Sequence, residues 1–209
     1  MAEPAKRGKF IVLDGPEGSG KSTQVRLLAA RLAEAGIETT CVRDPGGTPV
    51  SERIREVLLD ADLPDMDPLT EMFLYMASRT EMVDRAIRPA MEAGRTVIAD
   101  RFISSTVVYQ GYAGGIDPQE ILRVGHLACR DTWPDLVVLL DVSAEEGFGR
   151  IHREHDRMER KGLAFHERVV EGFRRLARAD AEHHVLVDAG GSVDEVAARV
   201  WKAVERVVL

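Results

Sequence analysis

One short stretch near the start of the chain constrains its fold more than any other. Residues 15–22 read GPEGSGKS, which has the spacing of a Walker A loop: a glycine, four residues, then Gly-Lys-Ser or Gly-Lys-Thr. The apolar run 10–13 precedes this loop and a helical pattern follows it, which is the context that the motif requires. The sequence therefore predicts an α/β domain whose loop binds nucleotide phosphates between a strand and the start of a helix.

The residue types in this loop suit phosphate binding. Glycines allow the backbone amides to turn toward phosphate oxygens, and the helix that follows adds a partial positive charge at its first turn. Lys21 is expected to reach the β and γ phosphates, and the Ser22 hydroxyl is expected to bind Mg²⁺. Thr23 would either support the α phosphate or cap the helix. The predicted ATP-binding residues of the loop are Gly15, Pro16, Glu17, Gly18, Ser19, Gly20, Lys21, Ser22 and Thr23.

Apolar runs alternate with helical patterns along the rest of the chain. This alternation predicts one α/β domain over 1–209, with a five-stranded parallel sheet and helices on both faces. The last helix is predicted to begin at a capping box of Ser192 and Glu195, and its apolar stripe, which includes Val193, is assigned to the core. The expected strands are 10–13, 39–42, 96–99, 136–140 and 184–187.

Composition argues against several classes of protein. The chain has 209 residues, 44% of them hydrophobic, and a formal net charge of −7. Such a charge argues against sequence-independent binding of nucleic acid, which depends on many Lys and Arg. No apolar run is long enough to span a membrane, so a cytoplasmic protein is expected. Cys41 and Cys129 lack metal-ligand spacing and are assigned as buried apolar residues.

Because P-loops also serve switches and motors, the acceptor of the phosphoryl group has to be argued separately. A motor ATPase would need a longer domain with coupling motifs, which are not found. A GTPase switch needs a lysine followed two residues later by an aspartate. None of the lysines has that context, so a kinase is favoured; they are Lys6, Lys9, Lys21, Lys161 and Lys202.

Four predicted strands are followed by an aspartate, at the edge of the sheet where open α/β folds bind ligands. One of them, Asp100, is expected to act at the metal, by ordering its water, or to orient the neighbouring arginine. For Asp14, Asp141 and Asp188, a role in the site and a role in a turn or cap are both open.

Three clusters beyond the P-loop make the sequence more specific. They are 43–48 (RDPGGT), 73–79 (FLYMASR) and 100–111 (DRFISSTVVYQG), followed by DRME at 156–159 and FHERVVEGF at 165–173. In this order they resemble the bacterial thymidylate kinases nearly from end to end. The resemblance implies a nucleoside monophosphate kinase fold, a homodimer, and Mg²⁺-dependent phosphorylation of dTMP to dTDP by ATP in dTTP biosynthesis. Another nucleoside monophosphate kinase, or a non-catalytic nucleotide-binding regulator, remains an alternative.

Arginines at two strand ends are expected to hold the acceptor phosphate. Arg43 and Arg101 lie at the predicted ligand edge, where a guanidinium group can bind phosphate through two hydrogen bonds. The resemblance implies that Phe73 stacks on thymine and that Arg79 donates to its O4, although their spacing does not place them on one helix face. Preference for thymine over uracil stays open. The other predicted dTMP-binding residues are Ser105, Thr106 and Gln110, at the N3 edge, and Glu17, at the sugar 3′-hydroxyl or the metal shell.

Gly18 occupies a P-loop position at which one branch of the family has a catalytic arginine. The resemblance therefore places this chain in the other branch, where a mobile lid supplies the arginine. The predicted lid is 150–161, in which Arg150 would lie against adenine and either Arg153 or Arg157 would reach the transferred group. A phosphate monoester is largely ionised near neutral pH, so no general base is expected. The predicted catalytic residues are Lys21, Arg101, Arg153 and Arg157.

Overall fold

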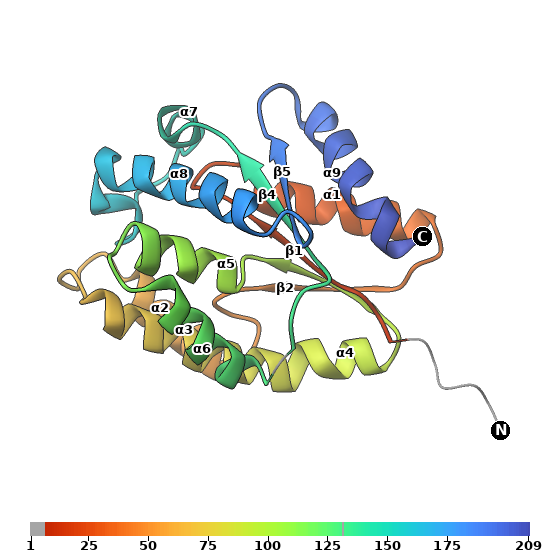
Figure 1. Cartoon of the computed structure of the whole chain (residues 1–209), viewed down its shortest axis with the longest axis horizontal. Coiled ribbons are helices and arrows are strands. Elements are labelled where there is room, and N and C mark those ends of the chain that lie inside the picture. Colours follow the sequence, from red (N-terminus) through yellow and green to blue (C-terminus); the bar gives the residue numbers. More distant parts are fainter. Residues whose placement is uncertain (1–6, 131) are drawn as a thin grey trace.

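The computed structural model describes residues 7–130 and 132–209. The predicted five-stranded parallel sheet with helices on both faces is confirmed, and each strand extends one residue beyond its predicted end (Figure 1). The strand order is β2 (Thr39–Arg43), β3 (Thr96–Asp100), β1 (Phe10–Asp14), β4 (Leu136–Asp141) and β5 (His184–Asp188).

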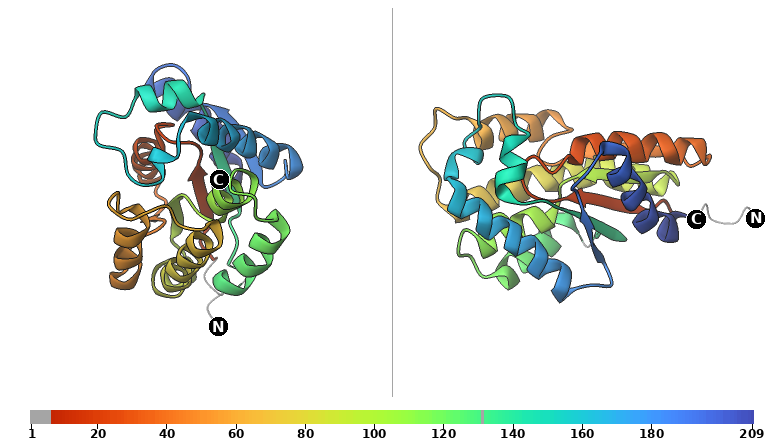
Figure 2. Two further views of the ribbon diagram at one scale, coloured as in Figure 1. Left: turned by 90° about the vertical axis from the view of Figure 1, so that its left-hand side faces the viewer. Right: turned by 90° about the horizontal axis from the view of Figure 1, so that it is seen from above.

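Helices cover the sheet in two layers. The first helix, α1 (Lys21–Glu34), and the last, α9 (Val193–Val208), pack together on one face (Figure 2). The other face is covered by α3 (Pro68–Met82), α6 (Pro118–Cys129) and α8 (Leu163–Ala179). The remaining helical segments are α2 (Pro49–Leu59), η1 (Val83–Ile87), α4 (Arg88–Glu92), α5 (Ile103–Thr106), η2 (Val107–Tyr112), α7 (Ala144–Gly149) and η3 (Glu159–Lys161).

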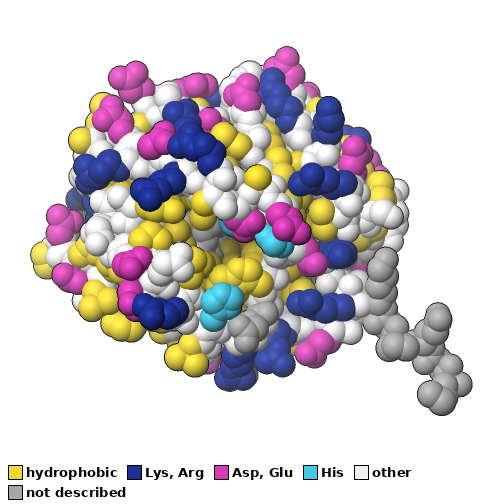
Figure 3. Space-filling view, viewed as in Figure 1, with side chains coloured by type: hydrophobic (Ala, Val, Ile, Leu, Met, Phe, Trp, Pro, Cys, Tyr) yellow, Lys and Arg dark blue, Asp and Glu magenta, His cyan; other side chains and the backbone are white. Residues whose placement is uncertain are grey.

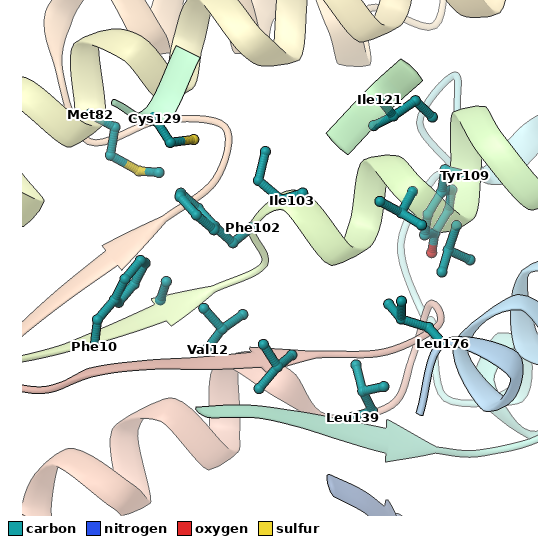
Figure 4. Packing of buried hydrophobic residues seen from close by; sticks show 14 of the residues in the cluster. Phe10, Val12, Met82, Phe102, Ile103, Tyr109, Ile121, Cys129, Leu139 and Leu176 are labelled. Atoms are coloured by element: carbon teal, nitrogen blue, oxygen red, sulfur yellow. The ribbon is translucent and has the colours of Figure 1, made fainter. Parts of the chain in front are cut away.

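Successive residues of the central strand β1 point to opposite faces of the sheet. Phe10 and Val12 pack into the core beneath α3, α6 and α8, whereas Ile11 and Leu13 pack against α1 and α9. In the first of these clusters Phe10 lies edge-on to Phe102, with 5.0 Å between ring centroids (Figure 4). Burial on both faces fixes the end of β1, and therefore the loop that follows it, relative to α1.

The segment after β3 is helical but not regular. It begins as the short helix α5 and widens into the π-helical segment η2, which carries Tyr109 and Gln110. Such widened turns are frequent at functional sites, because the additional residue moves side chains away from their regular spacing.

Two core assignments made from the sequence are wrong. Val193 is 53% exposed, because it is the first residue after the cap and precedes the part of α9 that reaches the sheet. Cys41 is exposed on the edge strand β2, whereas Cys129 is buried as predicted. The capping box is confirmed, since Ser192 Oγ accepts a 3.3 Å hydrogen bond from the Glu195 amide.

On the face drawn in Figure 3, Lys and Arg side chains are interspersed with Asp and Glu, as expected for a chain with 28 basic and 35 acidic residues. Within the described residues, every helix is too short or too polar to cross a membrane.

Candidate active site

A cavity of about 600 Å³ lies at the carboxyl edge of the sheet. Its wall is formed by the loop after β1, the ends of β2 and β3, helix α3, the segment α5–η2 and part of the predicted lid. The predicted site residues that line it are Glu17, Gly18, Gly20, Lys21, Ser22, Thr23, Arg43, Arg79, Asp100, Arg101, Ser105, Thr106, Gln110, Arg150 and Arg153; those that do not are Gly15, Pro16, Ser19, Phe73 and Arg157.

The P-loop wraps around the Lys21 ammonium group. Lys21 Nζ donates to the carbonyl oxygens of Gly15 at 3.1 Å and Pro16 at 2.7 Å, and to Ser19 Oγ at 3.2 Å. These three partners are buried behind the cavity wall, so they act on the site through the lysine. Burial, together with the positive charge of Arg101, lowers the pKa of Lys21 to about 8.

Gly18 has a φ of 66° and lies directly against helix α7. A Cβ at this position would lie 1.9 Å from the carbonyl oxygen of Gly147, and a Cβ on Gly147 would lie 2.2 Å from the carbonyl oxygen of Glu17. Both distances are far shorter than a van der Waals contact. The P-loop and α7 therefore meet backbone to backbone.

Ser22 and Asp100, the residues predicted to bind the metal, are in contact. Ser22 Oγ donates to Asp100 Oδ2 at 2.6 Å, which joins the start of α1 to the end of β3. Hydroxyl and carboxylate oxygens are ligands that Mg²⁺ prefers, and Mg²⁺ commonly keeps water and substrate phosphates as its other ligands. Among residues 7–130 and 132–209, no cluster of three or more His, Cys, Asp or Glu could hold a metal. The oxygen donors of Ser22 and Asp100 fit an Mg²⁺ ion that would take its other ligands from water and a nucleotide.

Arg101 lies between the P-loop and the segment after β3. Its φ of 71° is uncommon for a residue with a side chain. Nη1 donates to Asp14 Oδ1 at 3.2 Å and to the Gly15 carbonyl at 2.9 Å. Nη2 pairs with Glu17 Oε2 at 2.9 Å. The guanidinium is thus fixed in the wall of the cavity.

Glu17 is the acidic neighbour of Arg101 on the P-loop. Burial alone would raise its pKa, but the charges of Arg101 and Lys21 and a 2.9 Å hydrogen bond from the Tyr109 hydroxyl lower the pKa to about 2. Glu17 is therefore ionised at neutral pH, and its carboxylate can only accept hydrogen bonds.

The other strand-end aspartates differ in their contacts. Asp14 is fully buried and accepts hydrogen bonds from the Gly15 amide at 2.8 Å and from Ser105 Oγ at 2.7 Å. It thereby holds the P-loop to the segment after β3. Asp141 forms a 3.0 Å ion pair with an arginine of α8, and Asp188 accepts a 2.8 Å hydrogen bond within a turn. Neither Asp141 nor Asp188 lines the cavity.

Arg79 is buried at one end of the cavity. Its Nε donates to Asp44 at 2.5 Å, its Nη1 to Thr106 Oγ1 at 2.8 Å and its Nη2 to the Phe102 carbonyl at 3.0 Å. Burial raises the pKa of the Asp44 carboxyl, although Arg79 opposes this shift. Arg79 and Thr106, both predicted to contact the base, are therefore joined directly.

The placement of Phe73 at the thymine site is wrong. Its side chain is 54% exposed and does not line the cavity. The ring that lines the cavity belongs to Tyr75, and its centroid lies 5.7 Å from the Arg79 guanidinium carbon. Residues four apart share a helix face, whereas residues six apart do not. The spacing from Tyr75 to Arg79 is therefore the signal that sequence analysis missed.

Two further residues predicted to bind dTMP take different positions. Gln110 Nε2 donates to Glu71 on α3 at 2.8 Å, so this amide is fixed in the wall of the cavity. Arg43 lies at the exposed mouth and pairs with Glu52 at 3.4 Å. Long, exposed ion pairs contribute little stability, so Arg43 can leave Glu52 for a bound phosphate.

Two arginines of the predicted lid reach the cavity. Arg150 pairs with Glu146 at 2.5 Å and donates to the Ala189 carbonyl at 3.1 Å. Arg153 pairs with both oxygens of Glu159, at 2.7 and 2.8 Å, while 61% of its side chain stays exposed. Arg153 is therefore held at the mouth of the cavity by the Glu159 carboxylate.

Arg157 is not at the cavity, which corrects its assignment as a phosphate-directed arginine. Its side chain is 3% exposed, and Nη1 donates to Glu71 Oε1 at 2.6 Å. Nε donates to the Leu58 carbonyl at 3.0 Å. A basic stretch does not reveal which arginine turns inward when the acidic partner lies 86 residues away.

The Walker A loop lies at the edge of a parallel sheet of order β2-β3-β1-β4-β5. The same cavity also has basic side chains from outside the loop, among them Arg79 and Arg101. These features define a P-loop nucleotide kinase. The family model for thymidylate kinase matches residues 13–200. The chain belongs to the thymidylate kinase family, as its resemblance to the bacterial enzymes predicts.

Individual relatives support the same conclusion. The chain is 45% identical to the thymidylate kinase of Synechococcus sp. strain JA-2-3B'a(2-13), over 94% of this chain and 94% of that protein. It is 39% identical to that of Halalkalibacterium halodurans, over 96% of this chain and 97% of the relative. The crystal structure of the thymidylate kinase from Ehrlichia chaffeensis matches with a TM-score of 0.74 at 31% identity, covering 94% and 98% of the two chains.

Proposed function

We propose that this protein transfers the γ-phosphoryl group of ATP to dTMP, giving ADP and dTDP for dTTP biosynthesis. The observation that carries the proposal is one cavity in which the P-loop faces a second wall containing Arg101, Tyr75 and Arg79. The P-loop suits the donor phosphates, and the second wall offers a cation for a monophosphate and a ring for a base. Membership of the thymidylate kinase family supports dTMP as the acceptor.

In this proposal the acceptor lies along the second wall. Arg101, with Arg43 turning in from the mouth, binds the dTMP phosphate through charge-assisted hydrogen bonds. The Tyr75 ring stacks on the base, in place of Phe73. The other acceptor contacts are Arg79 and Thr106 at the O4 and N3 edge, Ser105 and Gln110 beside them, and Glu17 toward the sugar 3′-hydroxyl.

The chemistry depends on neutralising charge and not on removing a proton. The dTMP phosphate, with a second pKa of about 6, is largely a dianion near neutral pH. One of its oxygens forms a bond to the γ phosphorus while the bond to the β–γ bridging oxygen breaks. Lys21 Nζ exchanges its loop carbonyls for the β and γ phosphate oxygens. Mg²⁺, held through Ser22 and Asp100, would offset the phosphate charge.

The lid supplies the remaining positive charge. Gly18 leaves the P-loop without an arginine, so Arg153 is assigned to the transferred phosphoryl group and Arg150 to the adenine ring. Both side chains line the cavity, which supports their assignment over Arg157. Closure of the segment 150–161 over a single domain, 1–209, would exclude water, which competes with dTMP for the phosphoryl group.

The proposal also covers the location, the oligomeric state and the partners of the protein in the cell. We expect a cytoplasmic homodimer that binds neither nucleic acid nor membrane. A net charge of −7 supports the absence of nucleic-acid binding. Two apolar side chains one turn apart on α3, Leu69 at 47% and Phe73 at 54% exposed, are available for a subunit contact. Analytical ultracentrifugation of the parent protein and Phe73→Asp would test that contact.

An enzyme-coupled assay of ADP release tests the proposed function. The purified protein is given MgATP with dTMP, dUMP, dCMP, AMP or GMP in turn, and Lys21→Met is the control for contaminating kinases. We expect the highest kcat/KM with dTMP. A preference for AMP or GMP, or ATP binding with no turnover of any monophosphate, would contradict the proposal.

A further inference from the structure

Glu71 on α3 is a buried carboxylate to which the proposed function gives no role. Its side chain is 1% exposed, and it lies one helical turn before Tyr75. Oε2 accepts a 2.8 Å hydrogen bond from the Gln110 amide. Oε1 accepts from Arg157 Nη1 at 2.6 Å and from Lys161 Nζ at 2.7 Å. One carboxylate therefore joins the base end of the cavity to the last residues of the lid.

The lid side of this cluster consists of two cations with little access to water. The side chains of Arg157 and Lys161 are 3% and 14% exposed, and both pair with the same oxygen of Glu71. A buried charge needs a compensating partner, and removing that partner is strongly unfavourable. The Glu71 carboxylate therefore helps to hold the end of the lid in this position.

The cavity side of the cluster fixes the orientation of an amide. An ionised carboxylate can only accept hydrogen bonds, so Gln110 must turn its NH₂ group toward Glu71. Its carbonyl oxygen then lies on the other branch of the planar amide. Because Gln110 lines the cavity, this leaves the acceptor group of the amide for a ring N–H such as that at N3 of thymine.

We propose that Glu71 is a positioning residue that couples recognition of the acceptor base to the position of the lid, an inference that rests on the function proposed above. A base that binds the Gln110 side-chain amide stabilises the same amide orientation that Oε2 of Glu71 stabilises. Oε1 of Glu71 holds the end of the lid through Arg157 and Lys161. Coupling between two sites is reciprocal, so an ordered lid also favours acceptor binding. The lid then closes preferentially over a cavity that contains dTMP, which limits transfer of the phosphoryl group to water.

The substitution Glu71→Gln tests this coupling without changing the size of the side chain. A neutral amide cannot accept hydrogen bonds from Gln110, Arg157 and Lys161 together. We expect the KM for dTMP to rise about tenfold, as for the loss of a charge-assisted hydrogen bond, with a much smaller change in the KM for ATP. The matched control is Glu81→Gln on the same helix, because Glu81 pairs with Arg85 at the surface and should behave as the parent does.

Hydrogen–deuterium exchange of peptides covering 150–161 gives the direct readout. We expect saturating dTMP to slow exchange of these peptides in the parent and in the control variant Glu81→Gln, but not in Glu71→Gln. Equal protection by dTMP in Glu71→Gln, with a parent-like KM, would overturn the coupling. If Glu71→Gln does not fold by circular dichroism, Lys161→Met decides: lost protection supports the proposal and retained protection overturns it. Failure of the parent to phosphorylate dTMP would instead refute the proposed function.

Discussion

Binding of ATP at alkaline pH should be accompanied by uptake of a proton on Lys21. Burial and the charge of Arg101 lower the pKa of this lysine from 10.5 to about 8 in the protein without nucleotide. The triphosphate of ATP places several negative charges around Nζ and should return the pKa toward its usual value. Lys21 is therefore partly neutral before binding and fully charged after it.

The size of the effect follows from these two pKa values. At pH 9 about nine-tenths of the free protein carries a neutral Lys21, so binding should take up about 0.9 proton per site. At pH 7 the uptake should fall to about 0.1 proton, because the free lysine is already charged. Above pH 8, kcat/KM for ATP should fall by about tenfold for each pH unit, as the protonated fraction falls.

Isothermal titration calorimetry measures this uptake directly. A non-hydrolysable ATP analogue is titrated at pH 7 and at pH 9, each in two buffers of different ionisation enthalpy. The difference in observed enthalpy between buffers gives the number of protons, and Lys21→Met should remove the pH-dependent part. The reasoning is refuted if the parent takes up no more protons at pH 9 than at pH 7.

Three pairs of measurements test the other assignments. Arg101→Ala should raise the KM for dTMP tenfold to a hundredfold, the equivalent of about 1.5 to 3 kcal/mol, and the KM for ATP much less; equal increases in initial-rate assays would count against it. Tyr75→Ala should weaken dTMP binding by about 1 to 3 kcal/mol in calorimetry through loss of stacking, whereas Phe73→Ala should not; the reverse order would restore Phe73. Arg153→Ala should lower kcat in single-turnover assays, whereas Arg157→Ala should cost about 3 to 5 kcal/mol of stability; a stable Arg157→Ala with reduced kcat would reverse these roles.

Much of the fold could be predicted from local patterns in the sequence. Apolar runs place all five strands, and the Ser192 capping box places the start of α9, because these signals involve neighbouring residues. The Walker A loop is equally local, and it fixes Lys21 and Ser22 at the start of α1. Ser22 meets Asp100 because the P-loop that leads to Ser22 leaves the end of β1, and β1 lies beside β3, the strand that ends at Asp100.

The remaining part of the site depends on contacts between distant segments. Whether Tyr75 or Phe73 lines the cavity depends on how α3 is rotated, which the packing of its buried face decides. Arg153 and Arg157 are alike in a sequence, but only Arg157 meets a buried carboxylate 86 residues earlier in the chain. Long-range partners of this kind leave no periodic or motif signal near the residue itself.

At Gly18, the sequence and the structure each contribute a different part of the argument. The sequence establishes only that no arginine is present at this position of the P-loop, and the family resemblance makes the lid the expected source of that charge. The structure adds that a side chain has no room there, because a Cβ would lie 1.9 Å from the Gly147 carbonyl oxygen. That contact fixes α7 on the P-loop, and Arg150 and Arg153 follow α7 directly into the cavity wall. An arginine in the loop would therefore clash with α7 in this position. The contact that leaves no room for an arginine at Gly18 also places Arg150 and Arg153 in the cavity wall.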